Sequence, residues 1–317
     1  MDQLNLRAKN WEEFIGQDQV VKSIKIAMSA AQKRSSVLDH ILLYGPPGLG
    51  KTTLAHLVAG SLGVNLKITS GPSLTRVGDL ASILTQLEVG DVLFIDEIHR
   101  LNKSVEETLY PAMEDYALDM VIGKGPGARS VRLDLNRFTL IGATTKAGMV
   151  SAPLRDRFGL VHRLKYYTIP DLIQIVTTAA KGFNIKLDSG SAEEIAKRSR
   201  GTARIALKLL RRVIDFASVE HEKEPNPMIT QISLEFYQVD ELGLDETDRR
   251  LLTAIIEDYD GGPVGLETLA ALVSEDINTI TDVYEPFLMQ SGFLARTQRG
   301  RVATPKAFRH LNIKPKP

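Results

Sequence analysis

The sequence predicts an α/β domain built on a parallel sheet, followed by an all-helical domain and a winged-helix domain. Three observations predict this fold class. Short apolar runs with strand character alternate with helical periodicity through the first half of the chain. One of these runs leads directly into a glycine-rich phosphate-binding loop. Beyond Pro170 the pattern becomes helical, and it ends in three short helices and a basic hairpin. We therefore expect domains at residues 1–169, 170–241 and 242–317.

The phosphate-binding loop is the most specific signal. Residues 45–53 read GPPGLGKTT, which fits the pattern G-x-x-x-x-G-K-[ST]. An apolar strand at residues 41–44 precedes the loop and a helix at residues 53–59 follows it. Backbone N–H groups and the helix N-terminus can then surround a phosphate. Lys51 is expected to reach the β- and γ-phosphates, and the Thr52 hydroxyl to bind Mg²⁺. The alternative is a Gly-Pro turn that happens to end in Lys-Thr.

Two further strands end in polar residues. Residues 91–95 form an apolar run that leads into Asp96 and Glu97, and the strand at residues 138–145 ends at Thr145. Parallel strands present their carboxyl ends at one edge of a sheet, so these side chains should converge on one nucleotide. Asp96 can hold Mg²⁺ and Glu97 can polarise a water. Alone, the two carboxylates would be an acidic turn, and His99 by itself is weak evidence of a base.

The rest of the first domain is read from periodicity. Helices are expected near residues 18–32 and 78–87, with a strand at residues 65–69. Residues 116–140 alternate apolar and polar positions around a turn at 123–127, which predicts a hairpin that interrupts the α/β order. Its apolar face suggests contact with a protein partner or DNA, but a hairpin packed on its own core fits equally well.

Two arginines follow the last strand expected in the first domain. Arg155 and Arg157 lie in a short polar turn, where they could clamp a phosphate or form surface salt bridges. The sequence leaves this choice open.

The second domain is predicted to be helical. Helices are expected at residues 171–181, with Asp171 as N-cap, and at residues 191–200 and 203–221. Arg204 would be an ordinary helix-surface arginine on this evidence alone.

The third segment has the order of a winged helix. Helices at residues 245–258, 266–273 and 276–290 precede strands at 293–297 and 301–304. The hairpin that these strands form carries Arg296, Arg299 and Arg301, which would contact phosphate oxygens of duplex DNA without reading bases. A winged helix can instead bind a protein.

Composition supports a globular protein and excludes several kinds of site. Hydrophobic residues make up 43% of the 317 residues and charged residues 25%. There is no apolar run of about 18 residues and no secretory signal, so we expect a cytoplasmic protein without membrane contact. The absence of cysteine excludes disulfides and thiolate metal sites. Net charge is zero, but no acidic residue follows Glu285, which predicts a local basic surface; a solvated basic tail is the alternative.

Together these motifs resemble the AAA+ class of P-loop ATPases and, within it, the RuvB family of bacterial motors that drive branch migration of Holliday junctions. The resemblance runs from residue 6 to about residue 311. The motifs that carry it are residues 45–53, 93–101, 142–145, 152–159, 261–266 and 299–301. The first is shared by many NTPases, and the later ones are specific to the family.

The resemblance implies a role for each matching residue at the phosphates. Lys51 and Thr52 match the phosphate and Mg²⁺ residues, and Asp96 and Glu97 match the metal and catalytic carboxylates. Thr145 matches the first sensor. ATP or ADP with Mg²⁺ is the implied ligand.

The resemblance also implies roles for residues away from this centre. Arg157 matches the arginine finger that reaches a neighbouring subunit's γ-phosphate, and Arg204 matches the second sensor. Residues matching the nucleotide pocket are Leu6, Arg7, Ile15, Gly48, Gly50, Thr53 and Tyr167. Glu114, Asp115 and Tyr116 match positions near a neighbour's nucleotide.

The partners implied are those of the family. They are duplex DNA at Holliday junctions, the junction-binding protein RuvA through the hairpin at residues 117–135, and the resolvase RuvC, with a homohexameric ring as the assembly. The chain departs from the family where Ala8, Ala203 and Gln298 replace a usual proline. Two rivals fit the motifs less fully: an ATP switch that regulates transcription, and a clamp-loader-like remodeller of proteins.

Overall fold

A computed structural model describes residues 7–122, 129–220 and 224–314. The chain divides into two compact units. The first runs to Phe183 and includes Gly201–Leu207, and the second contains Asn184–Arg200 and the chain from Lys208 onward. This division assigns part of residues 170–241 to the first unit and part to the second. The three domains expected from the sequence therefore stay a prediction.

The first unit is built on a parallel sheet. Its order is β2-β3-β6-β1-β7, and every neighbouring pair is parallel. The strands are β1 (Ile41–Tyr44), β2 (Leu66–Ser70), β3 (Val92–Asp96), β6 (Thr139–Thr144) and β7 (Leu160–Arg163). The three inner strands are almost wholly buried because helices cover both faces of the sheet. The predicted parallel α/β architecture is confirmed.

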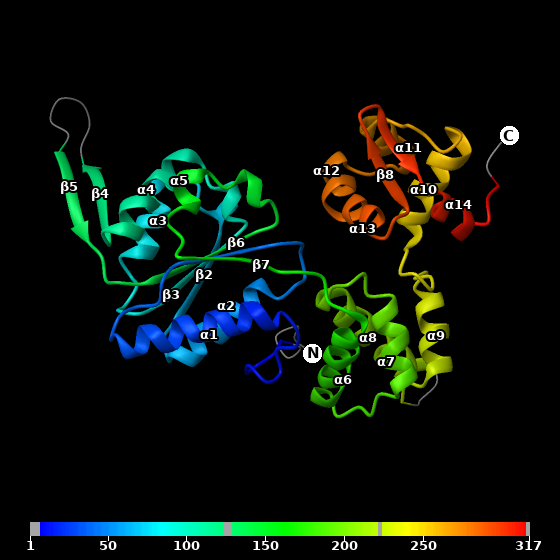
Figure 1. Ribbon diagram of the computed structural model, residues 1–317, viewed down its shortest axis with the longest axis horizontal. Helices are drawn as coiled ribbons and strands as arrows, with labels where there is room; N and C mark the ends of the chain where they lie inside the picture. Colours follow the sequence, from blue (N-terminus) through cyan, green and yellow to red (C-terminus); the bar gives the residue numbers. More distant parts are fainter. Residues whose placement is uncertain (1–6, 123–128, 221–223, 315–317) are drawn as a thin grey trace. The chain divides into compact units, whose positions relative to one another are not determined.

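Helices lie on both sides of this sheet (Figure 1). On one side are α1 and α2, and on the other are α3 and α4. Their bounds, with α5 and α6, are Asp18–Lys33, Lys51–Leu62, Val77–Leu84, Lys103–Glu114, Ala152–Arg155 and Ile169–Gly182. Short 3₁₀ turns occupy Gly71–Ser73, Ile98–Arg100 and Ala147–Met149. Leu80, Leu93 and Leu109 belong to the core between the sheet and α3 and α4. This core holds the polar carboxyl ends of the strands in place.

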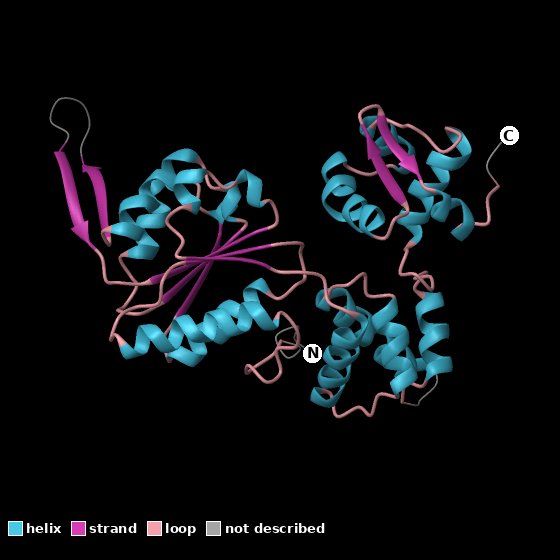
Figure 2. Ribbon diagram, viewed as in Figure 1, coloured by secondary structure: helices cyan, strands magenta, loops and turns pink. Residues whose placement is uncertain are grey.

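The predicted hairpin is present as a separate two-stranded ribbon (Figure 2). It consists of β4 (Ala117–Ile122) and β5 (Arg129–Asp134), paired antiparallel. At its base Leu118 is fully buried in the main core, whereas Leu133 on the facing strand is partly exposed. The base is therefore anchored on the domain's own core, and the ribbon continues outside the five-stranded sheet. The predicted turn at residues 123–127 lies outside the described residues.

The second unit contains helices and a small antiparallel sheet. Its first helices are α7 (Ser189–Lys197), α8 (Ala203–Glu220, of which the start belongs to the first unit) and α9 (Pro227–Phe236). The winged-helix segment contains α10 (Glu246–Asp258), α11 (Leu266–Val273), α12 (Ile277–Thr279), a π-helical turn (Ile280–Tyr284), α13 (Glu285–Gln290), β8 (Leu294–Thr297), β9 (Gly300–Ala303) and α14 (Pro305–His310). A second hydrophobic core, which includes Leu252, Leu269 and Phe293, joins these elements.

Two local predictions need correction. The N-cap of α6 is Thr168, not Asp171, because the Thr168 side chain accepts from the Asp171 N–H while the Asp171 carboxylate accepts from the Thr168 N–H. The helix expected at residues 276–290 is interrupted by the π-helical turn, which ends just before Pro286. Pro286 has no N–H to donate, so it also removes one helical hydrogen bond at this point of the chain.

Among the described residues, no helix combines the length and the apolarity that crossing a bilayer requires.

Matched isoleucine truncations test the core. Ile95 on β3 is fully buried, whereas Ile68 on the edge strand β2 is 50% exposed. We expect Ile95→Ala to lower the free energy of unfolding by about 2–5 kcal/mol, since it leaves a cavity. Ile68→Ala should cost less than about 1 kcal/mol. Urea denaturation followed by circular dichroism measures both, and equal costs would contradict the layered core.

Candidate nucleotide site

The phosphate-binding loop turns sharply before α2 begins at Lys51. Gly48 and Gly50 have φ angles of 80° and 97°, which L side chains rarely adopt. The Lys51 ammonium is buried and donates to the carbonyl oxygens of Gly45 at 2.7 Å and Pro46 at 2.9 Å. Burial lowers the pKa of Lys51, while the carboxylate of Asp96 opposes the shift. The loop thus holds one desolvated positive charge against its own backbone.

The carboxyl ends of β3 and β6 meet at this edge of the sheet. Glu97 has a φ of 47°, and its N–H donates to Asp96 Oδ1 at 2.9 Å. The Thr145 hydroxyl donates to Glu97 Oε2 at 3.1 Å. The same oxygen lies 3.1 Å from His99 Nδ1, which is 2.9 Å from the Thr144 hydroxyl. The structure therefore brings together the predicted Asp96, Glu97 and Thr145. His99 joins them as a contact of Glu97 that spacing alone did not single out.

Aromatic residues support the loop from behind. The Tyr167 hydroxyl donates to the Leu49 carbonyl at 2.9 Å, and burial raises the pKa of Tyr167. A Cβ added at Gly50 would lie 2.9 Å from the Phe14 ring, and one at Gly16 would lie 3.0 Å from Tyr167. Phe14 was not predicted as a site residue, because an apolar residue in a short loop carries no chemical signal.

The other residues expected in the nucleotide pocket are placed as follows. Ile15 is half-buried and directly follows Phe14 in the chain. Arg7 lies 3.1 Å from His56 on α2, measured from Nη1 to Nε2. Thr52 and Thr53 are half-buried in the first turn of α2. Leu6 lies outside the described residues.

The start of α8 packs directly on the phosphate-binding loop. The Arg204 N–H donates to the Gly48 carbonyl at 3.3 Å. A Cβ added at Gly48 would lie 2.7 Å from Arg204 Cβ and 3.4 Å from Thr202 Cβ. Arg204 thus lies against the phosphate-binding loop, within the first compact unit. Ala203 begins α8, a position that suits proline, so its substitution keeps the helix start but not a fixed φ.

Arg157 belongs to a different cluster. Its Nη1 donates to the Pro153 carbonyl at 2.6 Å, and its Nη2 pairs with Glu114 Oε2 at 3.1 Å. The guanidinium lies 4.3 Å from the centre of the Tyr110 ring, and the side chain is 21% exposed. Its Nε has no hydrogen-bond partner within the described parts of the chain. The arginine therefore contacts its own α4 rather than its own phosphate-binding loop.

The residues beside Glu114 have separate contacts. Asp115 pairs with Arg132 of β5 at 2.8 Å. Tyr116 has a φ of 52° and packs edge-on against Phe138. Glu114 is thus the member of this group that faces Arg157, and the other two shape the hairpin base.

The basic hairpin is split between exposed and buried arginines. Arg296 and Arg299 are exposed on the wing formed by β8 and β9. Arg301 is only 10% exposed, and its Nε and Nη2 donate to the two carboxylate oxygens of Glu285 at 2.7 and 3.2 Å. The DNA contact expected of Arg301 stays a prediction, and within this chain a buried bidentate partner already neutralises its charge.

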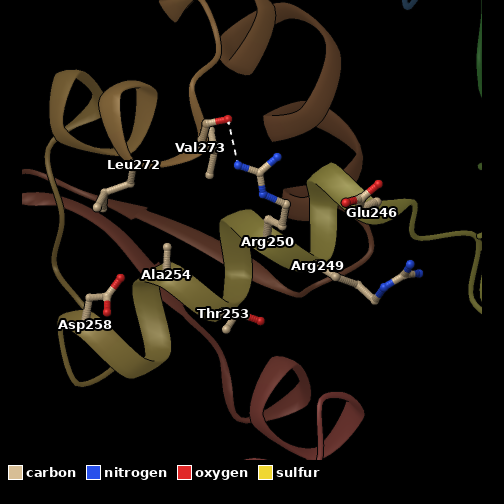
Figure 3. A pocket seen from close by; sticks show the side chains of 8 residues that line it. All are labelled: Glu246, Arg249, Arg250, Thr253, Ala254, Asp258, Leu272 and Val273. Carbon is tan, nitrogen blue, oxygen red and sulfur yellow. Dashed lines mark hydrogen bonds between the residues drawn. The ribbon is translucent and has the colours of Figure 1, made fainter.

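A surface hollow of about 360 Å³ lies between α10 and α11 (Figure 3). Glu246, Arg250 and Leu272 line it, and Arg250 Nη2 donates to the Val273 carbonyl at 3.4 Å. Its lining comes wholly from the winged-helix segment, so it is not the nucleotide site. Within the residues that the structure describes, no group of three or more His, Asp or Glu side chains could hold a metal by itself.

Comparison with known proteins decides the family. Family models described as the Holliday junction DNA helicase RuvB P-loop domain, the RuvB AAA lid domain and the RuvB C-terminal winged helix domain match residues 6–164, 167–240 and 241–312. The chain belongs to the RuvB family.

Solved structures of a RuvB protein agree. The Thermotoga maritima RuvB Holliday junction branch migration motor is 50% identical, with 98% of this chain and 99% of that chain covered and a TM-score of 0.88. A mutant of that protein is 51% identical, with 97% and 99% covered and a TM-score of 0.89. The predicted RuvB resemblance and fold class are confirmed. This member of the RuvB family is accordingly an AAA+ P-loop ATPase that binds nucleotide and carries a winged-helix domain. The family consists of branch migration motors.

Glycine substitutions test the loop geometry. Gly48→Ala should weaken ATP binding about tenfold or more, since it combines a positive φ with a collision at Arg204. Gly60→Ala is the matched control, because Gly60 lies within α2 and a Cβ there meets nothing within 4 Å. The control should stabilise the helix by about 0.5–1 kcal/mol and leave binding unchanged. Titration with a fluorescent ATP analogue measures both, and unchanged affinity of Gly48→Ala would contradict the packing described.

Proposed function

We propose that the chain is an ATP-driven DNA translocase that powers Holliday junction branch migration in recombination and repair. It works as a homohexameric ring with a RuvA-type junction-binding partner and a RuvC-type resolvase. The observation that carries this proposal is the combination, in one chain of the RuvB family, of a phosphate site and an arginine directed away from it. Cytoplasmic location in a bacterium stays a prediction.

The chemistry is hydrolysis of the bond between the β- and γ-phosphates. Lys51 binds the β- and γ-phosphate oxygens, and Glu97 polarises a water whose oxygen attacks the γ-phosphorus. The P–O bond to ADP breaks, and the water's proton leaves through the carboxylate. Thr145 and His99 hold Glu97 Oε2, which leaves Oε1 for the water.

Mg²⁺ fits the donors present. It prefers a few protein oxygens together with phosphate oxygens and waters, and Thr52 and Asp96 supply a hydroxyl and a carboxylate without a closed protein cage. When bound, it would neutralise phosphate charge. Arg204, at Gly48, supplies a further positive charge from the start of α8.

Arg157 acts on the next protomer. Its pair with Glu114 joins a partly exposed guanidinium to a carboxylate that is 57% exposed, and such pairs contribute at most about 1 kcal/mol. A neighbour's triphosphate carries more negative charge and can displace Glu114. The residue therefore leaves its own α4 to complete the neighbour's site, so that hydrolysis depends on assembly.

The DNA and protein contacts come from two ribbons. Arg296 and Arg299 on the wing contact phosphate oxygens of the duplex, which gives sequence-tolerant binding. The hairpin at residues 117–135 is the docking element for the junction-binding partner.

ATP-dependent dissociation of a synthetic four-way junction tests the proposal. Equal dissociation with a non-hydrolysable analogue, or none with ATP and partner, would contradict it.

Substitution of the trans arginine has a specific signature. Arg157→Ala should lower ATPase activity about 10³-fold or more in assembled protein, as removal of an arginine finger does in other NTPases. Mixing it with Lys51→Ala should restore hydrolysis at mixed interfaces, since one variant offers ATP and the other the arginine. Arg155→Ala is the control, because Arg155 is exposed on the same turn. Normal hydrolysis by pure Arg157→Ala would rule out the trans mechanism.

The wing arginines should separate binding from stability. Arg296→Gln and Arg299→Gln should each lower the salt dependence of duplex binding by about one phosphate contact. Arg301→Gln should instead lower the free energy of unfolding by about 3 kcal/mol or more, because Glu285 is left buried without its partner. Fluorescence anisotropy over a salt series and urea denaturation measure the two effects. Stability equal to wild type for Arg301→Gln would contradict the structural role.

A further inference from the structure

The chain crosses between the two compact units three times: after Phe183, inside α8 after Leu207, and at the peptide bond between Arg200 and Gly201. The two residues of that bond have positive φ angles, 51° and 70°. Helix α7 has ended at Lys197 and α8 begins at Ala203, so the bond lies in a short turn without helical hydrogen bonding. A left-handed pair between two helices is a natural position for a pivot, and the contacts differ sharply on its two sides.

On the side of the second unit, the Arg200 side chain is clamped to the winged-helix segment. Its Nε donates to the Gly243 carbonyl at 2.8 Å, and its Nη2 donates to Asp245 Oδ2 at 2.9 Å and to Asp248 Oδ2 at 2.5 Å. The guanidinium lies 4.6 Å from the centre of the Phe287 ring, and the side chain is 11% exposed. Arg200 therefore holds the start of α10 and a residue of α13 at once.

The carboxylates of this clamp make it stiff. Asp245 caps α10, and Asp248 completes the capping box. Asp248 is fully buried; burial raises its pKa, and the positive charge of Arg200 opposes that shift. Loss of one partner from a buried pair is strongly destabilising, so this contact does not open easily. Nearby, Arg198 Nη1 donates to the Val239 carbonyl at 3.0 Å and adds a second tie.

On the side of the first unit, the next residues contact the nucleotide site. The Gly201 carbonyl accepts from the Tyr167 N–H at 2.9 Å, and the Tyr167 hydroxyl in turn donates to Leu49 of the phosphate-binding loop. Arg204 contacts the same loop through Gly48. Five consecutive residues thus carry, at one end, a clamp on the DNA-binding segment and, at the other, a backbone contact with the phosphate loop.

We propose that Arg200 is the positioning residue that couples the nucleotide site to the winged helix. Displacement of residues 201–204 on hydrolysis is transmitted through Arg200 to α10 and α13, with Gly201 as the pivot. Residues 184–200 and the winged-helix segment then move together, because the buried hydrogen bonds of Arg200 hold them to each other. This inference rests on the proposed function, since a motor requires such a link and a simple ATPase does not.

The test measures ATP consumed for each four-way junction dissociated. For Arg200→Gln, ATP affinity should stay within about twofold of wild type, because the substitution does not touch the loop. The ratio of ATP hydrolysed to junctions dissociated should rise at least about tenfold. Arg200→Lys keeps the charge but not the fork, and it should restore part of the coupling. Arg211→Gln is the control, since Arg211 on α8 forms only a partly exposed pair with Asp215 and should leave the ratio unchanged.

The outcomes separate the inference from the proposed function. If wild-type protein does not dissociate junctions, the proposed function fails. If wild type does so and Arg200→Gln shows the same ratio, the coupling role is overturned. If Arg200→Gln loses ATP binding through misfolding, the same two quantities are measured for the double variant Arg200→Gln, Asp248→Asn, which removes both buried charges. Normal coupling, or loss of ATP binding, in that variant also overturns the proposal.

Discussion

Neutralisation of phosphate charge is the constraint on which the site depends. The phosphate-binding loop supplies one buried ammonium, that of Lys51, and the adjoining strands supply the carboxylates of Asp96 and Glu97. Taken alone, these groups do not favour a triphosphate, because the carboxylates offset the lysine. Further positive charge is therefore needed, and it can come from Mg²⁺ and from residues outside the sheet. The start of α8 brings Arg204 to the loop, and in the proposed mechanism a second guanidinium comes from another protomer.

That requirement explains how chemistry can be linked to movement. In the proposed mechanism, the site is active only when α8 and a neighbouring protomer are both in place, so hydrolysis depends on the positions of both. The cis pair of Arg157 with Glu114 is weak enough to exchange, whereas the buried pairs of Arg200 and Arg301 are built to persist. Under the two proposals, the exchangeable pair of Arg157 serves assembly, the pairs of Arg200 transmit movement, and the pair of Arg301 holds the wing.

The sequence was informative where chemistry and periodicity coincide. A phosphate loop between a strand and a helix, and carboxylates at a strand end, specify both fold and site, so the meeting of Glu97 and Thr145 was predictable. Long-range ion pairs were not, because spacing says nothing about which charges meet in space. The lack of acidic residues after Glu285 predicted a basic wing. It did not predict that Glu285 itself forms an ion pair with Arg301. Likewise Arg200 had no motif to mark it, and the short strand β7 was hidden by its polar residues.

The most direct test of the central claim is the ATPase rate per protomer as a function of protein concentration, at saturating ATP and Mg²⁺. A guanidinium supplied in trans requires this rate to rise from near zero at high dilution to a plateau as protomers assemble, while nucleotide binding by the dilute protein persists. A rate per protomer that stays constant over the whole range would show that each chain completes its own site, and would contradict the shared mechanism.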